Sequence, residues 1–284
     1  MATVIIIGSG FDLDLGLQNS FQEYNNYRLN LTYGDKKWSN LEEAYRNEVI
    51  KWYKSGKDEQ EAIRINIFWQ AHTLHLSYFL TEKSDSFCLN KNSCAYRLLQ
   101  ALTNRSRTYT FNYTNPYDYV DVIPVYEFTH LHGEYFRDTF ANNKAVMSQN
   151  MNLIIGIDKN CIPEDGINHA YIRPMVKEYH ISYKETDIIS SLDSAEVVIF
   201  FGFSMGIVDY VYFDKFFSSV IDGDNNCKMV YYVTWDNNSY RGFIQNISRF
   251  GVDLDKLNRQ VSIVPIYTNQ GPDNKKFVDM LEFV

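Results

Sequence analysis

The fold is decided first by the N-terminal stretch VIIIGSGFD, residues 4–12. Four apolar residues run directly into a glycine turn, which is typical of a strand buried on both faces of a parallel sheet. Glycines in such a turn let the backbone approach a phosphate, with N–H groups directed at it. The full G-x-G-x-x-G pattern is absent because position 13 is leucine. A tight strand-to-helix turn without any ligand is the alternative interpretation.

Similar short apolar runs, bounded by Gly, Asn or Asp, recur along the chain. We expect strands at residues 3–7, 107–111, 126–131, 153–157, 196–201, 228–233 and 260–265. Helical patterns occur at residues 40–53, 59–80, 92–104, 209–221, 239–250 and 274–281. This alternation predicts an α/β fold, a Rossmann-type parallel sheet with helices on both faces.

The segment from about residue 20 to residue 105 interrupts the alternation, because it has helical patterns and no strand signal. Within residues 59–80, apolar side chains recur at steps of three and four, which predicts one buried helix face. These side chains are Ile63, Ile67, Ala71, Leu74 and Tyr78. We therefore expect one domain of residues 1–284 with an all-helical insertion, about 20–105, after the first strand.

Composition excludes several classes of protein. The chain has 284 residues, and 27 Lys and Arg against 35 Asp and Glu give a net charge of −8. This acidic balance argues against direct nucleic-acid binding, which needs a basic face. No apolar run approaches the ~20 residues of a membrane helix, and no signal-like segment is present, so we expect a cytoplasmic protein without a membrane partner. The four cysteines form no C-x-x-C pair, so we expect reduced thiols and no metal.

Polar side chains follow two more of the predicted strands. The first group is TFNYT, residues 110–114. At the carboxyl end of a parallel strand such groups face the ligand crevice, although Asn and Thr also cap turns. The second group is His130 and His132, followed by Gly133. Two residues apart on a strand they share a face, and histidine suits proton transfer near neutral pH. A buried histidine bonded to the backbone is the alternative.

A further motif is GFSMG, residues 202–206, after the predicted strand 196–201. It has the G-x-S-x-G form of the nucleophile elbow of α/β-hydrolases. That chemistry requires a histidine after the serine, whereas all six histidines precede Ser204. We therefore interpret Ser204 as a hydroxyl and N–H donor for an anion at the start of a helix. Asp209 follows at the beginning of that helix, near its positive end.

Taken in order, these motifs resemble the AbiH-like bacteriophage abortive-infection family. The resemblance is carried by residues 8–17 (GSGFDLDLGL), Ser20-Phe21, Tyr24, residues 38–42 (WSNLE), residues 111–114 (FNYT), His132-Gly133, residues 202–209 (GFSMGIVD) and Tyr212-Phe213. It spans most of the chain and implies a role in phage defence. A phage-derived trigger and a homo-oligomer are the partner hypotheses that accompany it.

That family in turn resembles the sirtuin fold and the sirtuin-like NAD-hydrolysing defence proteins. The matching positions are Gly8-Ser9-Gly10, residues 110–114, His132, and Gly202-Phe203-Ser204. Asp12 stands where sirtuins carry serine, and Thr114 stands where they carry aspartate. The chain also lacks the paired C-x-x-C motifs of the sirtuin zinc module, which argues against protein deacetylation.

The resemblance implies NAD as ligand or substrate, and cleavage of the N-glycosidic bond of NAD or a related nucleotide as the activity. It implies two catalytic residues, Asn112 to orient the ribose or the attacking water and His132 as general base. The residues expected to bind the nucleotide are Gly8, Ser9, Gly10, Phe11, Asp12, Thr110, Thr114, Gly202, Ser204, Met205 and Asp209. A non-catalytic nucleotide-binding defence sensor and a serine hydrolase using Ser204 are the alternatives.

Overall fold

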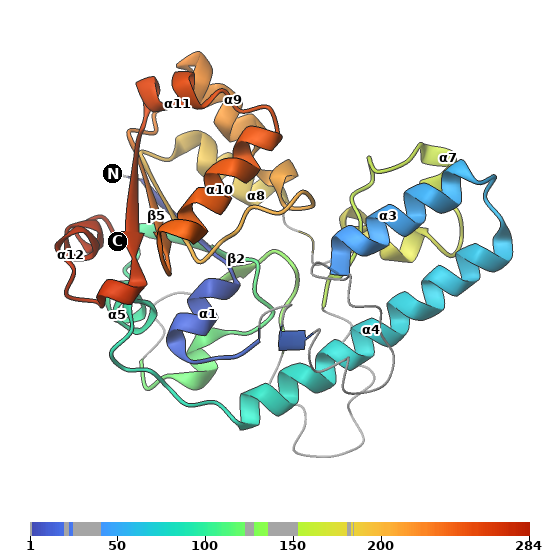
Figure 1. The fold of residues 1–284 in the computed structure, drawn as a ribbon, viewed down its shortest axis with the longest axis horizontal. Helices are drawn as coiled ribbons and strands as arrows, with labels where there is room; N and C mark the ends of the chain where they lie inside the picture. The colour runs from blue at the N-terminus through green and yellow to red at the C-terminus, as the bar shows by residue number, and fades with distance from the viewer. Residues whose placement is uncertain are drawn as a thin grey trace. The chain divides into compact units, whose positions relative to one another are not determined.

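The computed structural model describes residues 2–19, 23–24, 41–122, 128–135, 153–180, 183 and 185–284. The chain forms two compact units. The first unit consists of residues 1–18, 87–131 and 184–284, and the second of residues 19–86 and 132–183. The first unit contains the sheet, and the second contains the long helices α3 (Leu41–Lys54) and α4 (Glu59–Asp85) (Figure 1).

Six parallel strands form the sheet of the first unit. They are β1 (Thr3–Ile7), β2 (Ser106–Thr110), β3 (Thr129–His130), β4 (Val197–Phe201), β5 (Met229–Thr234) and β6 (Ser262–Tyr267). Their order is β3-β2-β1-β4-β5-β6, and all pairs are parallel. This confirms the predicted α/β fold and its Rossmann-type sheet. The order reverses between β1 and β4, and in open α/β sheets ligands bind at that switch point, outside the carboxyl ends of the strands.

Helices cover both faces of the sheet. On one face Ile5 and Ile7 of β1 pack into a buried cluster with residues of α1 (Ser9–Leu15), α5 (Cys94–Ala101) and α12 (Lys275–Leu281). On the other face the Phe200 ring of β4 lies 5.5 Å from that of Phe243 on α10 (Asn237–Arg249). Helix α9 (Asp214–Asp222) contacts both α8 (Glu185–Ser194) and α11 (Leu254–Gln260). Because both faces are covered, β1 and β4 are buried at every position and show no polar alternation.

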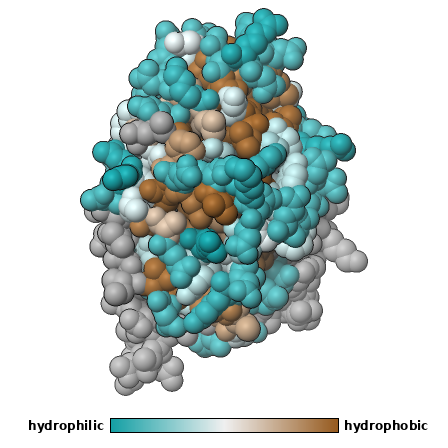
Figure 2. Space-filling view, turned by 90° about the vertical axis from the view of Figure 1, so that its left-hand side faces the viewer, coloured by the Kyte–Doolittle hydropathy of each residue, from teal (hydrophilic) through white to brown (hydrophobic). Residues whose placement is uncertain are grey.

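One edge of the sheet is formed by β6, which pairs with β5 alone among the described strands. Figure 2 views the molecule from the side of β6 and α12 and shows apolar residues enclosed by hydrophilic ones. Pro265, near the middle of β6, has no backbone N–H. Proline on an edge strand blocks the addition of another strand, so this edge is protected although part of its surface is apolar.

Helix α9 begins later than the sequence pattern predicts. Residues 209–213 precede it and include the short 3-10 turn η6 (Tyr210–Tyr212), and the α-helix starts at Asp214. The expectation that Asp209 begins the helix is therefore wrong. The other 3-10 turns of the first unit are η1 (Pro116–Tyr119) and η7 (Thr268–Gln270).

The second unit is built around α3 and α4. Helix α3 buries Leu41, Tyr45, Val49 and Trp52, which recur at helical spacing on one face. A short helix, α7 (Glu164–Ile167), and two 3-10 turns, η4 (Arg173–Met175) and η5 (Lys177–Tyr179), follow later in the chain. The described helices of the predicted insertion are thus divided, since α3 and α4 belong to the second unit and α5 to the first. One domain with an insertion stays a prediction.

Two expectations fail in the second unit. Residues 153–157 form no strand, because they make only a single bridge between Ile157 and Val176. The predicted buried stripe of α4 is also misplaced. Ile67 is 59% exposed, whereas Ile65 is buried. Apolar residues occur on all sides of this helix, so their spacing does not define one inner face.

Within the described part of the chain, no helix combines the length and the apolar character needed to cross a membrane.

Candidate functional site

Two glycine loops meet at the switch point of the sheet. The N–H of Gly8, after β1, donates to the carbonyl of Phe201 at 2.9 Å, and the N–H of Gly10 donates to that of Gly202 at 2.9 Å. A Cβ on Gly10 would lie 2.7 Å from Gly202 Cα, and a Cβ on Gly202 would lie 2.3 Å from Phe11 N. Glycine is therefore required at both positions so that the backbones can touch.

These contacts change what the first loop can offer to an anion. The N–H groups of Gly8, Gly10 and Phe11 all donate to protein carbonyls, the last to Gly8 at 2.9 Å. The sequence pattern suggested that these N–H groups are directed at a phosphate, but in the structure they are not. Ser9, the first residue of α1, is exposed, so its hydroxyl is a donor that this loop can present to solvent.

Asn112, which follows β2, is held against the same loop. Its side-chain Nδ2 donates to the carbonyl of Gly8 at 3.0 Å, and its backbone N–H donates to Thr110 Oγ1 at 3.0 Å. Because the amide nitrogen must face the Gly8 carbonyl, the amide oxygen of Asn112 faces the opposite way. Thr110 is fully buried and acts on the site through this bond.

Asp12 and Thr114 contact each other. The hydroxyl of Thr114 donates to Asp12 Oδ2, and both side chains are buried. The carboxylate of Asp12 is therefore bound inside the unit, where it ties α1 to the segment after β2. Asp12 and Thr114 support the loops rather than present groups to solvent.

The loop after β4 carries two residues with positive φ. Gly202 has φ +61°, and the buried Met205 has φ +54°. A positive φ in a non-glycine residue costs about 1–3 kcal/mol, so the surrounding packing must impose it. In a nucleophile elbow the strained turn carries the serine itself, whereas here Met205 is strained and Ser204 is not. This geometry does not favour a serine hydrolase.

Ser204 is exposed, and its carbonyl accepts a bond of 2.9 Å from Asn246 Nδ2 on α10. The loop is thereby fixed to a helix while the Ser204 hydroxyl faces solvent. Asp209 is half-buried and lies just before η6.

His130, the last residue of β3, supports Asn112 from behind. Its Nδ1 lies 3.1 Å from the carbonyl of Asn112. Burial lowers the pKa of His130 to about 4, and the bond to Asn112 opposes this shift. The ring is therefore neutral near pH 7, with its proton on Nδ1 facing the carbonyl. The sequence pattern pairs His130 with His132 but indicates no binding or catalytic role for His130.

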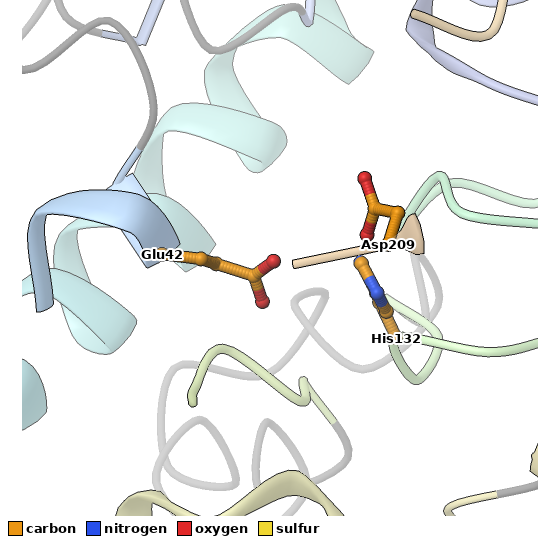
Figure 3. A group of neighbouring side chains, drawn as sticks. All are labelled: Glu42, His132 and Asp209. Carbon is orange, nitrogen blue, oxygen red and sulfur yellow. The ribbon is translucent and has the colours of Figure 1, made fainter. Parts of the chain in front are cut away.

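His132 lies beyond the end of β3, in the second unit, so the two histidines do not share a strand face. Its Nε2 lies 3.2 Å from Lys177 Nζ, which also binds Glu42 Oε2 at 2.8 Å. The other oxygen of Glu42, Oε1, accepts from the N–H of Gly156 at 3.2 Å. Figure 3 shows Glu42 extending from α3 toward His132; Asp209, also labelled there, belongs to the first unit.

The side chains of Glu42, Lys177 and His132 are almost completely buried. Glu42 is 1%, Lys177 3% and His132 4% exposed. Burial lowers the pKa of His132 well below its usual value, and the positive charge of Lys177 lowers it further. Burial raises the pKa of Glu42, and Lys177 opposes that rise. In the sequence Glu42 stands out only as part of the WSNLE motif, and nothing marks Lys177.

The predicted site residues thus fall into two sets. One set lies at the carboxyl ends of β1, β2 and β4 or in the segments that follow them in the first unit, helix α1 included: Gly8, Ser9, Gly10, Phe11, Asp12, Thr110, Asn112, Thr114, Gly202, Ser204, Met205 and Asp209. Within that set Ser9 and Ser204 are exposed, whereas Phe11 is a core residue whose ring lies 5.0 Å from that of Phe201. The remaining predicted site residue, His132, belongs to the second unit.

Comparison with known proteins gives two findings. No curated protein matches the sequence. A family model described as Bacteriophage abortive infection AbiH matches residues 4–232, a range that includes every predicted site residue.

Proposed function

Since the chain belongs to the bacteriophage abortive infection AbiH family, we propose that it serves phage defence by binding and hydrolysing NAD or a related nucleotide. Family membership suggests the role in abortive infection. That the ligand is a nucleotide, and that it binds at the switch point of the sheet in the first unit, is our proposal.

One observation carries the proposal. The order β3-β2-β1-β4-β5-β6 places the carboxyl ends of β1 and β4 at the switch point, and both strands end in glycine loops that touch there. The same strand order is used for dinucleotide binding in Rossmann folds. Ser9 and Ser204 supply exposed donors beside these loops. The N–H groups of Gly8, Gly10 and Phe11 already donate to protein carbonyls. Serine hydroxyls would therefore make a larger share of the phosphate contacts here than in a glycine-rich loop whose N–H groups face the ligand.

Asn112 is the residue we propose to act on the substrate from the first unit. Its amide oxygen faces away from Gly8 and can accept a bond from a ribose hydroxyl or from water. Cleavage of an N-glycosidic bond passes through a positively charged ribose, which an amide oxygen held in place stabilises. His132 of the second unit is the predicted general base, and its replacement by alanine tests that part of the hypothesis separately.

Isothermal titration calorimetry with NAD, ADP-ribose and ATP tests binding, and chromatography of the mixtures tests turnover. We expect Ser9→Glu and Ser204→Glu to weaken binding at least tenfold, because each puts a negative charge beside a phosphate. Ser248→Glu is the matched control, since Ser248 is an exposed serine on α10. Asn112→Ala should abolish product formation.

The outcomes separate the hypotheses. Binding with release of nicotinamide supports the hydrolase. Tight binding without product supports the non-catalytic sensor. The nucleotide proposal is wrong if the wild-type protein binds none of the three compounds. Labelling of Ser204 by a fluorophosphonate would favour the serine hydrolase, and we expect none.

A further inference from the structure

Trp235 follows β5 at the carboxyl edge of the sheet, and its side chain is largely exposed. Its exposed fraction, 62%, is the highest among the large apolar side chains of the described residues. A ring of this size normally stabilises a fold by burial, because its large apolar area is then removed from water. The exposed indole therefore contributes little to the packing of the first unit and is accessible to a ligand.

Hydrogen bonds join the end of β5 to the loop that follows β4. The N–H of Gly202 donates to the carbonyl of Val233, two residues before Trp235, at 2.8 Å. Helix α10 begins two residues after Trp235, and its Asn246 donates to the carbonyl of Ser204 at 2.9 Å. Because β4 and β5 are parallel, Trp235 and Ser204 both lie at the carboxyl edge of the sheet, where ligands of open α/β sheets bind.

The backbone around Trp235 is held on both sides. Its carbonyl accepts a bond of 3.3 Å from the N–H of Asn269, which follows β6. The next residue, Asp236, caps α10, and its Oδ1 accepts bonds of 2.9 Å from the N–H and from the hydroxyl of Ser239. The ring is thus attached to an ordered segment, which limits the conformational entropy lost when a ligand binds to it.

The chemistry of this position suits a base better than a phosphate. Aromatic side chains bind nucleotides by stacking on the base, since every base has a π-face. The carboxylate of the adjacent Asp236 disfavours a phosphate here, because like charges repel. The exposed serines remain the donors for the phosphates, and Trp235 provides a surface for an uncharged ring.

The strand order indicates which base this is. A dinucleotide binds across the switch point, with one nucleotide on each side. Asn112, the residue assigned to the ribose whose bond is cleaved, follows β2 on the β1 side. Trp235 follows β5 on the β4 side. The two residues therefore serve opposite halves of the ligand.

We propose that Trp235 stacks on the base of the half that is not cleaved, and that it makes the site select dinucleotides over mononucleotides. This inference rests on the proposed function for the class of ligand and for the role of Asn112. In NAD the base concerned is adenine, which ADP-ribose keeps after nicotinamide has left. ADP-ribose should then depend on Trp235 as strongly as NAD does, whereas nicotinamide mononucleotide should not depend on it.

Calorimetry with these three compounds tests the assignment. We expect Trp235→Ala to weaken the binding of NAD and ADP-ribose roughly 5- to 150-fold, the range for loss of one base stack, and to leave nicotinamide mononucleotide unaffected. Trp235→Phe keeps a stacking ring and should recover most of the affinity. Tyr78→Ala is the matched control, because Tyr78 is an aromatic residue on α4 that is 49% exposed, and it should bind like the wild type.

Fluorescence reports on the indole itself. The difference between the spectra of wild type and Trp235→Phe isolates Trp235 from the other three tryptophans, and AMP should quench that signal saturably. Circular dichroism checks that each variant is folded.

The outcomes separate this inference from the proposed function. If NAD and ADP-ribose bind wild type and Trp235→Ala equally, or if all three compounds weaken alike, the stacking role is refuted while nucleotide binding stands. If NAD and ADP-ribose do not bind but AMP quenches Trp235, the proposed function fails and the stacking role stands. Absence of both binding and quenching refutes both.

Discussion

Replacement of Gly202 by alanine should be among the most damaging single-methyl changes in the first unit. Gly202 has φ +61°, and a Cβ there would lie 2.3 Å from Phe11 N, 2.4 Å from Gly10 C and 2.5 Å from Gly10 Cα. All three atoms belong to the backbone of the opposing loop, so no side chain can rotate away. The loops must separate, or the backbone of Gly202 must change.

The magnitude follows from two contributions. An L-residue in the left-handed region costs roughly 1–2 kcal/mol, and forcing an extra methyl into a packed site costs typically about 1–3 kcal/mol. The sum is about 2–5 kcal/mol. Gly223→Ala is the matched control, because Gly223 also has a positive φ, +81°, but nothing lies within 4 Å of its added Cβ. Both variants carry the cost of an L-residue with positive φ. The difference between their losses in free energy of unfolding, about 1–3 kcal/mol, therefore measures the steric cost of the contact between the loops.

Urea unfolding followed by circular dichroism measures the free energy of unfolding of both variants, with the wild-type slope used for conversion. Gly242→Ala extends the series, since Gly242 lies inside α10 with open space around it. It should stabilise the protein by up to about 1 kcal/mol. The reasoning is refuted if Gly202→Ala loses no more stability than Gly223→Ala.

Three more predictions concern stability. Thr114→Val removes the hydroxyl that donates to buried Asp12 and should lower the free energy of unfolding by about 1–3 kcal/mol; Thr114→Ser, which keeps the hydroxyl, should lose less in the same urea assay. The pKa of His130 falls from 6.5 to about 4 on folding, so between these values the unfolded chain binds a proton that the folded chain does not, and stability should fall by up to about 3 kcal/mol as pH drops through that window. A His130→Asn variant, which keeps a donor but does not titrate, should show a flatter pH dependence; an equal slope would contradict the assignment. Ile65→Ala should cost about 2–4 kcal/mol, whereas Ile67→Ala, at a 59% exposed position, should stay within about 0.5 kcal/mol; thermal melts that reverse this order would show that the orientation of α4 is wrong.

The sheet was predictable because its signal is local. The runs 4–7 and 197–201 are continuously apolar and each is followed directly by a glycine, so they indicate strands covered on both faces without reference to the rest of the chain. The position of Asn112 at the carboxyl edge of the sheet is predictable for the same reason, since it lies shortly after the end of β2. Because the strands are parallel, the loops that follow β1, β2 and β4 are expected at the same edge of the sheet.

Other features depend on contacts between distant residues and have no local signal. Lys177 bonds to Glu42, 135 positions earlier in the chain, and to His132, 45 positions earlier, and nothing around Lys177 marks it as buried. The internal use of the Gly8 and Gly10 N–H groups depends on the carbonyls of the loop after β4. A glycine-rich turn has the same sequence whether its N–H groups bind a ligand or a neighbouring loop.

The joining of the two loops by backbone hydrogen bonds affects how this protein can evolve. Gly8 and Gly10 reach Phe201 and Gly202 through main-chain atoms alone, so the frame of the site does not depend on which side chains face the solvent. Substitutions at Ser9 and Ser204 can alter the chemistry presented there while the frame persists. Variation among relatives should therefore concentrate at these two exposed positions, whereas the glycines stay invariant.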